Sequence, residues 1–137
     1  MGNMKPHILT VLGYMVATFA TQATSHFVLF AQHYAAVPFI KREPIFALGF
    51  LSMIIQGTVM SFVFANSRLS GKSILHAVMF AWLFGAFFVS YISLGEAAKY
   101  AVPSIQSWIA VELLSGFVQF TLAGIFLGFA HRARTAV

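Results

Sequence analysis

The stretch SIQSWIAVELLSGFVQFTLAGIFLGFA, residues 104–130, decides what kind of protein this is. A helix of this length is about 40 Å long at 1.5 Å per residue, enough to cross a hydrocarbon core of roughly 30 Å. One acid, Glu112, interrupts the apolar run. A charged carboxylate at the centre of a membrane helix costs roughly 2.5–3.5 kcal/mol on insertion scales, so such a group generally faces protein or water and has a partner. The partners of Glu112 are therefore the first place to look for a function.

The composition of the whole chain agrees with a membrane location. Of the 137 residues, 60% are hydrophobic and 8% are charged, whereas roughly 25% is ordinary for a soluble protein. The net charge of +5 would suggest nucleic acid as the partner of a soluble protein. Here the basic residues lie between apolar segments, where they set the topology and contact lipid headgroups, so the expected partner is the bilayer and not nucleic acid. The sequence has no cysteine, which excludes disulfides and thiolate metal ligands.

Three further apolar segments precede residues 104–130, separated by short connectors that hold prolines, glycines and charges. The four predicted membrane helices cover about residues 8–31, 45–65, 73–94 and 104–130. Each has the length that a transmembrane helix needs. The sequence therefore predicts an all-α integral membrane protein: a single domain over residues 1–137, with four transmembrane helices in an up-down bundle.

The basic residues predict how this bundle is oriented. The side with both termini holds more of them, namely Lys5, Arg68, Lys72, Arg132 and Arg134, and the other side holds Lys41, Arg42 and Lys99. Because cytoplasmic loops carry the excess of positive charge, we expect both termini in the cytoplasm, in a bacterial-type inner membrane.

Small residues recur at every fourth position of the predicted helices, and Gly124 and Gly128 form such a pair in the last one. Glycines spaced in this way let another helix backbone approach closely. That second helix belongs either to the same chain or to a second subunit, and the sequence leaves both alternatives open.

Polar side chains gather at one predicted depth. Glu112 lies about eight residues inside the outer end of its helix, and His26 lies at a similar depth in the first helix, roughly 12 Å inside the membrane. The same level of the bundle is predicted to hold Ser52, Gln56, Ser90 and Tyr91. Ser115 and Gln119 share the helix face of Glu112, and Gln22 shares that of His26, so both faces are expected to meet in one polar core. A cluster of this kind is either a satisfied pair that fixes the helix register, a proton or cation relay, or the floor of a small cavity open to the outside.

His26 is also a candidate ligand for a metal, a haem or a chlorin. His76 lies roughly 20 Å from it along the membrane normal, and His33 roughly 10 Å along the same helix, so neither joins it on one haem or one ion. His7, His76 and His131 fall near the cytoplasmic helix ends, where interfacial anchoring is favoured over a three-histidine zinc site. The first expectation is that no cofactor is bound, and a single-histidine haem or chlorin is the alternative.

The sequence contains no H-E-x-x-H or G-x-S-x-G motif, and an enzyme is not expected. The leading hypothesis is an accessory or structural subunit of a larger membrane complex, with other membrane subunits or further copies of itself as partners. The alternative is a small oligomeric proton- or cation-coupled transporter or channel that uses Glu112 and His26. The second alternative is a haem- or pigment-binding subunit with His26 as ligand.

Overall fold

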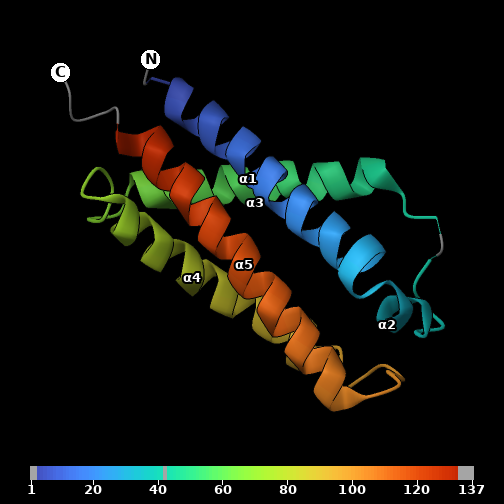
Figure 1. Ribbon diagram of the computed structural model, residues 1–137. Helices are drawn as coiled ribbons and strands as arrows, with labels where there is room; N and C mark the ends of the chain where they lie inside the picture. The colour runs from blue at the N-terminus through green and yellow to red at the C-terminus, as the bar shows by residue number, and fades with distance from the viewer. Residues whose placement is uncertain (1–2, 42, 133–137) are drawn as a thin grey trace.

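A computed structural model describes residues 3–41 and 43–132, and all regular structure in these residues is helical (Figure 1). Four helices are long and apolar enough to cross a membrane: Lys5–Leu29, Phe46–Ala65, Ile74–Gly95 and Ile105–Arg132. The predicted all-α fold with four membrane-spanning helices is confirmed, and the predicted segments overlap these ranges. Two residues of the topology prediction, Arg42 and Arg134, lie outside the described residues.

Two of the four spans end in a wider helical turn. The first consists of α1 (Lys5–Thr24) and the π-helical turn η1 (Ser25–Leu29), and the short helix α2 (Ala31–Ala35) follows it. The second span is α3 (Phe46–Ala65), and the third consists of α4 (Ile74–Ser90) and the π-helical turn η2 (Tyr91–Gly95). The fourth is α5 (Ile105–Arg132), which follows directly after a connector that contains Pro103.

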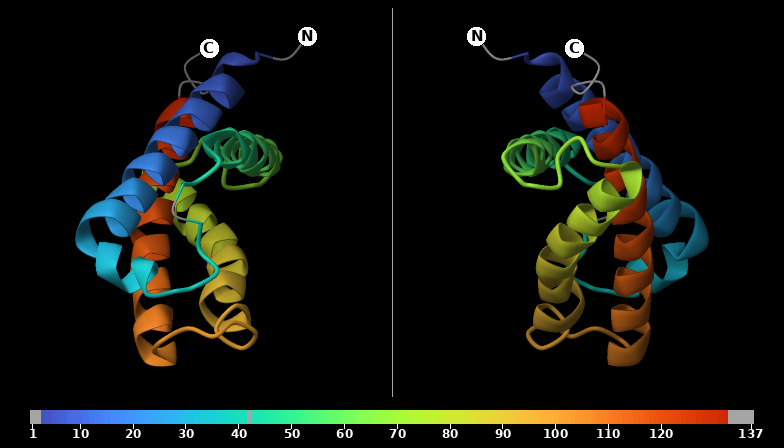
Figure 2. Two further views of the ribbon diagram at one scale, coloured as in Figure 1. Left: turned by 90° about the vertical axis from the view of Figure 1, so that its right-hand side faces the viewer. Right: turned by 90° about the vertical axis from the view of Figure 1, so that its left-hand side faces the viewer.

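The helices pack side by side in the order α4, α5, α1, α3. The spans α1 and α4 both run antiparallel to α5, and α1 begins at the end of the bundle where α5 finishes (Figures 1 and 2). Helix α3 crosses the others obliquely, so that Figure 2 shows it almost end-on. It packs mainly on α1 and meets α4 near its own C-terminal end, where the rings of Phe64 and Phe80 lie 5.1 Å apart. Helix α3 therefore makes little contact with α4.

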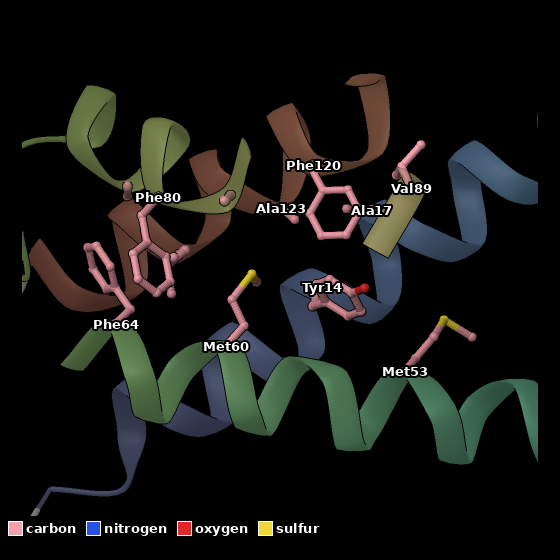
Figure 3. Close-up of a cluster of buried hydrophobic side chains, with 12 residues drawn as sticks. Tyr14, Ala17, Met53, Met60, Phe64, Phe80, Val89, Phe120 and Ala123 are labelled. Carbon is pink, nitrogen blue, oxygen red and sulfur yellow. The ribbon is translucent and has the colours of Figure 1, made fainter. Parts of the chain in front are cut away.

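Two hydrophobic clusters hold the helices together. The larger one joins α1, α3 and α5 with the α4–η2 span through Tyr14, Met60, Phe64, Phe80 and Phe120, among others (Figure 3). The smaller one packs Tyr34 and Val37 against Trp108 and Val111 of α5. The second cluster fixes α2 to the N-terminal half of α5, and this contact positions the polar site described below.

Gly124 and Gly128 face α4 of the same chain. A Cβ atom on Gly124 would lie 2.6 Å from the Cα of Val78, and one on Gly128 would lie 2.9 Å from the Cα of Ile74. Both distances are too short for any side chain, so the two backbones are in direct contact. The sequence leaves open whether this glycine pair contacts a helix of the same chain or of a second subunit. In the structure the pair contacts α4 of the same chain.

Candidate functional site

The chain changes direction at the end of the first span, and this turn builds the site. The Phe30 N–H donates to the carbonyl of Ser25 at 2.9 Å, which closes the wide turn η1. Such turns are frequent at functional sites, where the extra residue changes the direction of the side chains. The chain then folds back through α2, so that the ring of Tyr34 stacks on that of His26, with centroids 3.6 Å apart and planes at 11°.

Glu112 is buried, with 7% of its surface exposed, and its partner is Tyr34. The Tyr34 hydroxyl donates to Oε1 of Glu112 at 2.7 Å. A tyrosine hydroxyl keeps its proton at neutral pH, and a carboxylate oxygen accepts, so Tyr34 is the donor of this bond. Ser25 lies 3.4 Å from the Tyr34 oxygen and also bonds the hydroxyl of Ser115 at 2.8 Å. His26 and Glu112 thus belong to one site, but Tyr34 connects them and no hydrogen bond between the two is present.

A second set of hydrogen bonds extends from this site across three helices. Gln22 donates to Oε1 of Gln119 at 2.7 Å, and Gln119 in turn lies 3.4 Å from the hydroxyl of Tyr14. Tyr14 donates to Gln56 at 2.7 Å, and Gln56 donates to Ser52 at 2.9 Å. One chain of hydrogen bonds therefore links α5, α1 and α3. We call it the polar network, and its members are Tyr14 and the four predicted residues Gln22, Gln119, Gln56 and Ser52.

The predicted members Ser90 and Tyr91 lie elsewhere. Both are exposed: Ser90 donates to the carbonyl of Phe87 at 3.1 Å, and Tyr91 accepts a hydrogen bond from Lys99 at 2.7 Å. The bond to Tyr91 raises the pKa of Lys99. At this level of the span the side that packs inward carries Val89, which is buried, so Ser90 and Tyr91 share the depth of Glu112 without facing it.

A pocket of about 760 Å³ adjoins the site. Helices α1 and α3 are closest where Gly57 meets Val11, since a Cβ on Gly57 would lie 3.2 Å from the Val11 Cα. From there the two helices diverge towards the N-terminus of α3 (Figure 1). The pocket is lined by residues of both helices in this diverging part, and by the chain that connects them. Its volume is within the range of small-molecule sites, roughly 300–1,000 Å³. The walls are mostly apolar and include Phe19, Phe27, Phe46 and Phe50, and the polar groups come from Gln22, His26, Tyr34 and Lys41.

The ring of His26 lines this pocket with one nitrogen available. Its Nδ1 lies 3.0 Å from the backbone carbonyl of Gln22. A carbonyl only accepts, so this contact assigns the proton to Nδ1 and leaves the lone pair of the neutral ring on Nε2. Nε2 has no hydrogen-bond partner within residues 3–41 and 43–132. Nε2 can therefore accept a hydrogen bond from a ligand. It can also bind a metal, because metal-binding histidines commonly donate their other ring N–H to a carbonyl, as Nδ1 does here.

The other histidines have contacts of their own and do not form a metal site with Nε2 of His26. His33 stacks on Trp108, with ring centroids 5.8 Å apart, and His76 bonds Ser73 at the start of α4. His7 and His131 both bond the hydroxyl of Ser61, at 2.9 and 3.1 Å. In the described part of the chain, no three side chains of His, Cys, Asp or Glu are placed to hold one metal ion.

The sequence prediction missed Tyr34 because the reversal of the chain at η1 has no clear signal. Pro38 marks the loop, but nothing in the pattern shows that residues after the first span return to stack on it. An aromatic hydroxyl close in sequence to a membrane histidine and facing a buried acid is the signal to look for.

By the length and composition of its helices, this chain is a multi-pass membrane protein, and a polar network links three of its helices beside a ligand-sized pocket. In comparisons with known proteins, no family model matches the chain, and neither a curated protein nor a solved structure is significantly similar to it. What the chain does is therefore inferred from the pocket and its polar groups.

Proposed function

We propose that this protein binds a small amphipathic molecule in the pocket between α1 and α3 and couples its binding to the protonation of Glu112. It acts as a small ligand-binding or transport protein of a bacterial-type inner membrane, with both termini in the cytoplasm. The observation that carries the proposal is the position of Tyr34, which lines the pocket and also donates to Glu112 at 2.7 Å. A glutamate that served only to fix the helix register would need no open pocket beside its partner.

The coupling follows from what each group can donate and accept. An ionised Glu112 only accepts hydrogen bonds, and it holds the Tyr34 hydroxyl as its donor. A protonated Glu112 can donate, which frees Tyr34 to reorient its own proton. Because Tyr34 stacks on His26 in the pocket, a ligand that contacts this pair favours one protonation state over the other. By linkage, the protonation state then changes the affinity for the ligand by the same factor.

A second candidate, the accessory subunit, is favoured by the exposure of α3. Within an 18-residue apolar window, 22% of α3 is buried inside the protein, against 50% of α5. The hydrogen bond from Gln56 to Ser52 lies on its exposed surface near the middle of the helix. Polar side chains at that depth are typical of helix–helix contacts in membranes, so a second chain packed on α3 would explain the pair. The partner would be another membrane subunit or a second copy of this chain.

The experiment is native mass spectrometry of the protein extracted gently from its own membrane, with two variants of α3. Gly49 lines the pocket and has open space around its Cβ position, so Gly49→Phe fills the pocket without a backbone clash. Leu51 is 52% exposed and outside the pocket lining, so Leu51→Phe is the matched control. We expect the wild type and Leu51→Phe to carry the same added small-molecule mass and Gly49→Phe to lose it. We further expect Glu112→Gln to remove the pH dependence of this retention.

Equal retention in all three proteins would contradict a ligand in this pocket. Release of the wild type bound to other polypeptides, with no small-molecule mass, would favour the accessory-subunit candidate instead.

A further inference from the structure

We infer that the pocket takes a lipid-soluble molecule with a hydroxylated aromatic ring, a phenol or a quinol, whose hydroxyl donates to Nε2 of His26. The inference rests on the proposed function, since it names the chemical class of the ligand that the pocket would bind. Three features carry it: the acceptors among the polar groups of the pocket, the aromatic walls, and the position of the opening.

The first span contributes two hydrogen-bond acceptors to the pocket, one from His26 and one from Gln22. Nε2 of the neutral His26 ring carries a lone pair, and Oε1 of Gln22 has no partner among the described residues, while Nε2 of the same side chain donates to Gln119. The hydroxyl of Tyr34, which could donate, is engaged with Glu112. A ligand with only carbonyl or anionic oxygens would place its lone pairs against these acceptors. A ligand hydroxyl satisfies His26 or Gln22 directly, whereas a ligand without a donor would cover these half-buried acceptors and leave them unpaired, which is costly.

The walls and the opening favour a ring over a polar solute. Phe19 and Phe50 already stack with centroids 5.7 Å apart, and Phe46 lies 6.4 Å from Phe19, so these faces suit a further aromatic ring. Phe27 and Phe46 are 57% and 51% exposed and line the same pocket, on helix surfaces that face lipid. The ligand therefore enters sideways from the bilayer, and a hydrocarbon tail can stay in it. Lys41 also lines the pocket, and its ammonium group can donate to the second ring oxygen of a quinol.

The test compares 4-decylphenol with its methyl ether 4-decylanisole, in which a methyl group replaces the hydroxyl hydrogen, so that only the phenol can donate. Binding of the tritiated compounds is measured on the protein in nanodiscs, and protein-free nanodiscs correct for partition into lipid. We expect the phenol to bind about tenfold more tightly than the anisole, the effect of one net hydrogen bond. We expect His26→Phe to reduce phenol binding to the level of the anisole and to leave anisole binding unchanged. His76→Phe, which changes a histidine that bonds Ser73 outside the pocket, should preserve the difference.

The outcomes separate this inference from the proposed function. If both compounds bind equally and Gly49→Phe abolishes both, the hydroxyl is not recognised: the inference fails and the pocket stays a binding site. If neither compound binds above the protein-free discs, both the inference and a pocket open to such ligands are contradicted. A purified protein with the visible absorption of a tetrapyrrole that His26→Phe removes would also overturn the inference, because Nε2 would then bind a metal. The comparison of phenol with anisole is made on the wild type, so it holds even if His26→Phe fails to fold.

Discussion

Tyr34 is the residue on which the site depends, since it contacts His26, Glu112 and Ser25 at once. The ring covers one face of the imidazole, and the hydroxyl supplies the donor that a buried carboxyl group requires. A membrane helix tolerates a glutamate only if such a partner is present. The donor comes from outside the four spans, so the short helix α2 is part of the membrane domain and not merely a connector.

Replacing this tyrosine with phenylalanine keeps the ring and removes the donor. We expect Tyr34→Phe to lower the free energy of unfolding by about 1–3 kcal/mol, because Oε1 of Glu112 loses its donor in a buried site. Thermal unfolding in detergent, followed by circular dichroism, measures the change.

The control is Tyr100→Phe, which removes a hydroxyl from a residue that is 43% exposed and should leave the midpoint unchanged. Combining Tyr34→Phe with Glu112→Gln should cost less than the sum of the two single changes, because the pair shares one hydrogen bond. Strict additivity, or equal midpoints for Tyr34→Phe and the control, would show that the bond contributes nothing.

At the scale of the helices, the closest packing is between α4 and α5, and small residues make it possible. Gly124 and Gly128 lie against the backbone of α4, and Ala77 and Ala81 on the facing side are fully buried. Lipid tails are as apolar as leucine, so helices in a membrane gain little from hiding apolar surface and depend on close van der Waals contact. The two glycines therefore stabilise the bundle more than their size suggests.

Adding one methyl group tests this contact. Gly124→Ala should destabilise the protein by about 1–3 kcal/mol, because the new Cβ would lie 2.6 Å from the Val78 Cα and the helices must separate. Gly49→Ala is the matched control: its Cβ meets nothing within 4 Å, so it should be neutral or stabilise α3 by up to about 1 kcal/mol through helix propensity. Equal unfolding midpoints for the two variants would contradict close packing at Gly124.

The sequence predicted the helices well and their relative placement less well, for a physical reason. Length and hydropathy determine where a span lies, so residues 104–130 were assigned almost to their observed limits, Ile105–Arg132. The spacing along the helix faces also places Gln22 and Gln119 in one predicted polar core, and a hydrogen bond joins them in the structure. Depth does not fix the rotation of a helix about its own axis, and for that reason Ser90 was predicted inside but is exposed. The oblique path of α3, and with it the pocket, depends on packing that no periodicity in one sequence encodes.

At the scale of the whole molecule, the pocket originates from the oblique path of α3. Helix α3 contacts α1 closely at Gly57 and then diverges from it (Figure 1). The pocket is lined by residues of both helices beyond that contact. A closed parallel bundle would have filled this space with side chains. The pocket lies at the end of the bundle opposite the start of α1, so the orientation of the chain in the membrane decides which side the ligand site faces.

That orientation can be measured with single cysteines, since the natural chain has none to give a background. Ser70→Cys marks the connector between α3 and α4, and Glu43→Cys and Ala98→Cys mark the connectors at the other end, where both residues are exposed. Lys and Arg are in excess near the termini, which predicts that the end of the bundle with the termini and Ser70 is cytoplasmic. A membrane-impermeant maleimide should therefore label Glu43→Cys and Ala98→Cys in intact cells, and Ser70→Cys only after permeabilisation. The opposite pattern would place the termini outside and the pocket in the cytoplasmic half of the membrane, and a ligand from the outer leaflet would then be excluded.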